Sequence, residues 1–125
     1  MKILLDTHIW VWIFSDDSRL SKRARRQILD AEERYFSAAS VWELAIKANK
    51  RQFVGNLELL LSESEKLGLL PLPVTASHAL TVRDLPHHHS DPFDRLLVAQ
   101  ALFEPLILLT ANKKVSRYSK QIRLV

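Results

Sequence analysis

The chain has 125 residues, of which 47% are hydrophobic and 26% charged, which suits one folded domain (residues 1–125) and argues against a disordered chain. It has no cysteine, which excludes disulfides, thiolate zinc sites and a cysteine nucleophile. The formal net charge is +4, and lysines and arginines cluster at residues 22–26, 47–51 and 113–123, which favours phosphate-bearing partners. No apolar stretch is long enough for a signal peptide or a membrane span, so we expect a cytoplasmic protein.

Short apolar runs alternate with helix-forming segments along the whole chain. Five strands are predicted, at residues 2–5, 35–37, 69–74, 106–109 and 122–125. Helices are predicted to begin at residues that cap N-termini: Thr7, Ser21, Ser40, Asn56, Thr75 and Asp91. Pro71 and Pro73 place the third strand at an edge of the sheet. This order predicts an α/β fold with a mainly parallel central sheet of four to five strands and helices on both faces.

Acidic side chains lie at the ends or starts of several predicted elements. Asp6 ends the apolar run at residues 3–5, where an unpaired charge is costly to bury. Glu43 and Asp94 fall in predicted first helical turns, and sites in open parallel sheets form beyond the carboxyl ends of the strands, where Asp6 and Thr110 are. We therefore expect the three carboxylates to converge. Converging carboxylates repel one another, and Mg²⁺ or Mn²⁺ is the kind of ion that holds them together.

Each acid also has a purely structural explanation. Glu43 fits a capping box with Ser40, and Asp91 fits an N-cap because Pro92 suits the first helical position. An acid in a first turn, such as Asp94, stabilises the helix through a favourable interaction with its dipole. If Asp91 is the cap, Asp94 is the freer metal ligand and Asp91 a secondary one. The chemistry predicted for such a metal site is phosphodiester hydrolysis by an activated water, without a covalent intermediate.

Four segments carry a resemblance to a known family: LLDTH (residues 4–8), SAASVWELAIK (37–47), LPHHHSDPFDRLLVAQA (85–101) and LLTAN (108–112). In this order and spacing the chain resembles the PIN-domain ribonucleases, and among them the VapC-like toxins of bacterial toxin–antitoxin pairs. The resemblance implies a single PIN domain that acts as a metal-dependent endoribonuclease, with its first three acids at Asp6, Glu43 and Asp94. Many relatives carry a fourth acid near Thr110, where this chain has the uncharged Asn112, so one or two ions remain possible.

The resemblance also implies partners for the chain. They are an RNA substrate, a small antitoxin and a second copy in a homodimer. We expect Thr110 to orient a carboxylate or a water, and Lys47 and Arg95 to contact RNA, although Arg95 could instead pair with Asp94. The histidines at residues 87–89 are expected in a surface loop.

Two other functions stay open at this point. In a phosphotransfer domain Asp6 would be the phosphate acceptor, but the phosphatase pattern needs an acid where this chain has His8. In a non-catalytic RNA-binding module the acids would have no chemical role, and the missing fourth acid favours this alternative slightly. Stable phosphorylation of Asp6 would support the first, and RNA binding without metal or cleavage the second.

Overall fold

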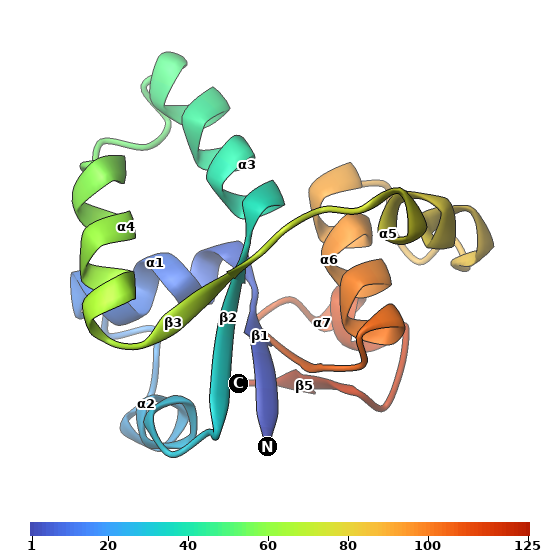
Figure 1. The fold of residues 1–125 in the computed structure, drawn as a ribbon, viewed down its shortest axis with the longest axis horizontal. Coiled ribbons are helices and arrows are strands. Elements are labelled where there is room, and N and C mark those ends of the chain that lie inside the picture. The colour runs from blue at the N-terminus through green and yellow to red at the C-terminus, as the bar shows by residue number, and fades with distance from the viewer.

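One parallel sheet organises the chain in the computed structural model, which describes residues 1–125 (Figure 1). Its strands are β1 (Lys2–Leu5), β2 (Glu33–Ser37), β3 (Leu69–Leu72), β4 (Ile107–Thr110) and β5 (Ile122–Leu124). They lie in the order β3-β2-β1-β4-β5, and every neighbouring pair is parallel. The α/β fold predicted from the sequence is confirmed, and β3, which contains Pro71, is an edge strand as predicted.

Helices fill the connections between the strands. They are α1 (Thr7–Ser15), α2 (Lys22–Leu29), α3 (Ala38–Asn49), α4 (Leu57–Lys66), α5 (Ala76–Thr81), the 3₁₀ helix η1 (Val82–Asp84), α6 (Pro92–Phe103) and α7 (Lys113–Ser116). In Figure 1, α1, α2 and α4 lie on one side of the sheet, and α5, α6 and α7 lie on the other. None of the helices has the length and apolar character needed to cross a membrane.

The central strand β1 carries a separate hydrophobic core on each face, because successive side chains of a strand point in opposite directions. Ile3 and Leu5 belong to a cluster of 12 buried residues that includes side chains of α1, α2 and α4. Leu4 belongs to a second cluster, of 11 buried residues, to which α6 contributes more side chains than any other element. Burial on both faces explains the uninterrupted apolar run. Because β1 is the middle strand, Asp6, which directly follows it, lies at the middle of the sheet's carboxyl edge.

The start of α1 differs from the prediction. Asp6, and not Thr7, is the N-cap of this helix, since Asp6 Oδ1 accepts a hydrogen bond from the His8 N–H at 2.8 Å. Thr7 is the first helical residue and is buried. Its hydroxyl lies 2.7 Å from the Ser40 hydroxyl, so this hydrogen bond joins α1 to α3. Asp6 therefore has a helix-capping role in addition to any chemical one.

The start of α3 also differs. The helix begins at Ala38 after the N-cap Ser37, whose hydroxyl oxygen accepts from the Ala39 N–H at 3.0 Å. The capping box predicted between Ser40 and Glu43 is therefore wrong, and Glu43 lies in the second turn of the helix. A structural role at the helix terminus does not explain this buried carboxylate.

Candidate active site

Asp6 is held at the point where β1 and β4 end side by side. Its backbone N–H donates to the Leu109 carbonyl at 3.0 Å, and the Thr110 hydroxyl donates to Asp6 Oδ2 at 2.7 Å. Only 3% of Asp6 is exposed. Burial raises the pKa of Asp6, although the hydrogen bonds from Thr110 and His8 and the proximity of the His8 side chain act in the opposite direction. The Thr110 hydroxyl thus contacts the carboxylate in the manner expected of an orienting group.

Asp94 shares a cavity with Asp6. It lies in the first turn of α6, and both side chains line a cavity of about 430 Å³. Burial raises the pKa of Asp94 to about 7, and the negative charges of Asp6, Asp91 and Glu43 add to this effect. The charge of Lys47 opposes it. Two carboxylates that are far apart in the sequence therefore line the same cavity in the fold.

Glu43 is the third predicted acid, and it is buried beside this cavity without lining it. Its Oε2 accepts from Lys47 Nζ at 2.8 Å, whereas Oε1 is the only buried side-chain oxygen or nitrogen in the structure without a hydrogen-bond partner. Its charge raises the pKa of both Asp6 and Asp94. Leaving a buried acceptor unpaired is unfavourable, so Oε1 is an oxygen available for a ligand.

The donor set suits a hard divalent cation. No three carboxylate or histidine side chains are grouped closely enough to form a ready-made metal site. Glu43 pairs with Lys47, and Asp94 faces His89. Glu43 Oε1 has no hydrogen-bond partner, and burial together with the neighbouring carboxylates raises the pKa of Asp94. A cation bound by carboxylate oxygens would relieve both.

Basic and polar side chains complete the lining of the cavity. Besides the two aspartates, the lining residues are His8, Trp12, Arg19, Ala111, Asn112 and Lys113. The Arg19 guanidinium lies over the Trp12 ring at 4.7 Å from its centroid and bonds Asp17 at 2.7 Å. Sequence reasoning missed Arg19, because it lies in a loop outside the basic clusters and only the fold brings it to the acids.

Asp91 and Asn112 both act as helix caps. Asp91 Oδ1 accepts from the N–H groups of Phe93 at 2.9 Å and Asp94 at 3.1 Å, so the predicted cap is confirmed. Asn112 Oδ1 accepts from the Lys114 N–H at 2.9 Å and caps α7. The side-chain oxygen of Asn112 is therefore already an acceptor, and Asp91 keeps only Oδ2 for any other ligand.

Arg95 does not have the position expected of an RNA-contacting residue. It is 7% exposed, and its guanidinium donates to the Pro86 carbonyl at 2.8 Å and to the Tyr118 hydroxyl at 2.9 Å. Weaker contacts reach the Val82 and Leu85 carbonyls, both at 3.4 Å. The ion pair with Asp94 is not formed, and the carbonyl groups around the guanidinium argue against the predicted RNA contact.

The histidine loop differs in part from the prediction. His87 and His88 are exposed as expected, but the His89 side chain is only 8% exposed, and its Nε2 lies 3.3 Å from Asp94 Oδ2. Burial lowers the pKa of His89. Sequence reasoning missed this contact, because nothing distinguishes the third histidine from the first two before the loop is folded.

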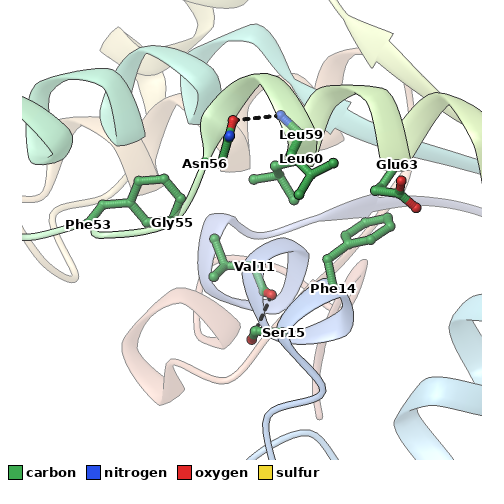
Figure 2. A pocket seen from close by; sticks show the side chains of 9 residues that line it. All are labelled: Val11, Phe14, Ser15, Phe53, Gly55, Asn56, Leu59, Leu60 and Glu63. Carbon is green, nitrogen blue, oxygen red and sulfur yellow. Dashed lines mark hydrogen bonds between the residues drawn. The ribbon is translucent and has the colours of Figure 1, made fainter.

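A second cavity, of about 180 Å³, lies between α1 and α4 (Figure 2). Val11 and Phe14 from α1 face Leu59 and Leu60 from α4 across it. Its only acidic residue is Glu63. An apolar groove with a single carboxylate cannot assemble an oxygen-ligand metal site, so this cavity is not the candidate active site.

Comparisons with known proteins agree with this fold and these motifs. The model of the PIN domain family matches residues 3–121. Ribonuclease VapC22 of Mycobacterium tuberculosis (strain ATCC 25618 / H37Rv) is 31% identical over 116 residues, which cover 90% of this chain and 88% of that protein.

Two solved structures share the fold over 100% of this chain. VapBC2 from Rickettsia felis, bound to a promoter DNA fragment, matches with a TM-score of 0.71 at 18% identity over 98% of its chain. DNA-bound VapBC from Salmonella typhimurium matches with a TM-score of 0.70 at 20% identity over 97% of its chain. This chain therefore belongs to the PIN-domain family, and within that family it is VapC-like.

Proposed function

We propose that the protein is an endoribonuclease toxin that hydrolyses RNA phosphodiester bonds with a divalent cation held by Asp6, Glu43 and Asp94. The observation that carries this proposal is that Asp6 and Asp94 line one cavity next to the buried Glu43. Burial raises the pKa of both aspartates, and the charge of Glu43 adds to this effect. Mg²⁺ is the proposed ion and Mn²⁺ the alternative, because every candidate donor is a carboxylate oxygen. Membership of the PIN-domain family argues against a phosphotransfer domain.

The residues around the carboxylates have separable roles. A bound divalent cation would supply the charge that activates water and stabilises a developing phosphate charge. The Thr110 hydroxyl and the His8 N–H hold the Asp6 carboxylate through both of its oxygens. Lys47 holds the Glu43 carboxylate through Oε2 and leaves Oε1 free for a ligand. The protein thus orients its ligands before the reaction, which lowers the cost of assembling the transition state.

The RNA backbone is proposed to lie along the basic rim of the cavity. Arg19 and Lys113 line the cavity of Asp6, and Lys47 lines an adjoining cavity with Arg19 and His8. Contacts of this kind attract phosphates and position the backbone, but they do not read bases. Lys47 also pairs with Glu43, so its proposed role combines ligand positioning with attraction of the phosphate.

Metal removal tests the proposal directly. With purified protein and total RNA, we expect cleavage in millimolar Mg²⁺ and a loss of about 10²-fold or more in excess EDTA. Adding Mg²⁺ or Mn²⁺ beyond the chelator should restore cleavage, while circular dichroism in EDTA should show an intact fold. Cleavage that persists unchanged in EDTA would overturn the cation's role, and metal-independent RNA binding without cleavage would support the non-catalytic alternative.

We also propose a small antitoxin and a second copy of this chain as partners. The structures from R. felis and S. typhimurium that share its fold are VapBC complexes, which supports the antitoxin. Trp42 is 60% exposed and packs edge-on against Phe93, an apolar surface suited to contact with another chain. Light scattering of the chain alone should give the mass of a dimer. The chain co-expressed with the product of an adjacent small gene should give the mass of a larger complex. A monomer in both preparations would contradict both partners.

A further inference from the structure

A continuous series of hydrogen bonds runs from a buried guanidinium to the Asp94 carboxylate. Arg95 Nη1 lies 2.9 Å from the Tyr118 hydroxyl, which lies 2.8 Å from His89 Nδ1. His89 Nε2 in turn lies 3.3 Å from Asp94 Oδ2. The Arg95 guanidinium also lies 5.8 Å from the centroid of the Tyr118 ring. Residues from the start of α6, the preceding loop and the segment after α7 therefore meet at one carboxylate.

The chemistry of the four groups, together with the distances between them, favours one direction for these bonds. A guanidinium can only donate, so the Tyr118 oxygen accepts from Arg95. The Tyr118 hydrogen then goes to His89 Nδ1 at 2.8 Å, which is much closer than its other acceptor, the His89 carbonyl at 3.4 Å. This leaves the ring hydrogen on Nε2, the nitrogen that faces Asp94. With neutral His89, each bond of the series therefore has one donor and one acceptor.

The same arrangement explains why Arg95 is enclosed. The carbonyl groups of Pro86, Val82 and Leu85 surround its other hydrogens, which fixes the guanidinium and with it the Tyr118 ring. A fixed donor at the end of a hydrogen-bond series holds each following group in one orientation. The side chains of Arg95 and His89 are nearly inaccessible to solvent, so water does not compete effectively with these bonds.

We propose that Arg95, Tyr118 and His89 form a positioning relay that orients the Asp94 carboxylate for the divalent cation, with Oδ2 held by His89 and Oδ1 directed to the metal. Tyr118 and His89 are positioning residues, since neither needs to touch substrate or metal in this role. The inference rests on the proposed function, in which Asp94 is a metal ligand. Groups that support metal ligands in this way typically change metal affinity by 10- to 100-fold when they are removed.

Mn²⁺ affinity, measured by electron paramagnetic resonance of the free ion, tests the relay without relying on activity. Tyr118→Phe, which keeps the ring over Arg95 but removes the hydroxyl, is expected to raise the Kd about tenfold. His89→Leu should do the same. His89→Gln should retain most of the affinity, because glutamine can place an N–H near the position of Nε2. His87→Leu, at an exposed position of the same loop, is the matched control and should bind as wild type does.

The outcomes separate the relay from simple folding effects and from the proposed function. The Mg²⁺ concentration for half-maximal cleavage should rise in Tyr118→Phe, while the rate at saturating Mg²⁺ approaches that of the wild type. The relay would be overturned if Tyr118→Phe and His89→Leu both bound Mn²⁺ with a Kd within twofold of wild type. It would also be overturned if these variants differed from wild type only in a lower melting temperature without metal. Failure of the wild type itself to bind millimolar Mn²⁺ would overturn the proposed function and the relay with it.

Discussion

Replacing Asp6 with asparagine is expected to lower RNA cleavage by about 10²–10³-fold or more while the protein stays folded. The asparagine side chain has the same shape, and its oxygen can still accept from the Thr110 hydroxyl or the His8 N–H. What it loses is a negative charge at the centre of the carboxyl edge, where a divalent cation needs it. The substitution should be tested by RNA cleavage in millimolar Mg²⁺, together with circular dichroism and thermal melting.

A matched control is available for this experiment. Asp84 is a surface acid whose side chain is 72% exposed and whose recorded ion pair is with its neighbour Arg83. Asp84→Asn removes the same charge from the protein without touching the cavity, so cleavage should stay within about twofold of wild type, as for most surface substitutions. Full cleavage by a clean Asp6→Asn preparation would contradict the role assigned to Asp6.

The second large effect is expected for Asp94→Asn, which should abolish cleavage and yet stabilise the metal-free protein above neutral pH. Folding raises the pKa of Asp94 to about 7 from its ordinary value of 3.8. Between these two pH values the folded state holds a proton that the unfolded state has lost. This group's contribution to stability is therefore greatest below pH 4 and is lost as the pH rises through 7.

Thermal melting in EDTA at pH 5 and pH 8 measures this effect. The advantage of Asp94→Asn over wild type should grow with pH and reach about 1–2 kcal/mol at pH 8, a value reduced for partial solvent exposure of the carboxylate. Added Mg²⁺ should raise the melting temperature of the wild type but not of the variant, because a ligand that binds only the folded state stabilises it. A variant that is less stable than wild type at pH 8 would show that burial and the neighbouring charges do not raise the pKa of Asp94 on folding.

The main features of the fold followed from short-range patterns in the sequence. The apolar run at residues 3–5 predicts a strand buried on both faces, and β1 is the centre of the sheet. Helix starts were predicted correctly where one capping residue stood alone, as at Ser21 and Asn56. They were wrong where two candidates lay close together, as with Ser37 and Ser40, because tertiary contacts decide which hydroxyl faces the helix end.

The site was predictable only where a residue's surroundings in sequence were unusual. Asp6 stood out because an acid directly after a buried strand needs a reason, and Asp94 because Asp91 already served as the cap. The environments of Arg95 and His89 depend on Tyr118, which is 23 and 29 residues away in the sequence. No local pattern contains that information, so the enclosure of Arg95 and the contact of His89 with Asp94 were not predicted.

The anomalous scattering of a crystal grown with Mn²⁺ tests the central claim most directly, since it locates the ion without reference to activity. The account predicts an anomalous peak among the carboxylates of Asp6, Glu43 and Asp94, and the loss of that peak in Asp94→Asn. A peak elsewhere on the protein, or no peak under conditions in which Mn²⁺ supports RNA cleavage, would contradict it.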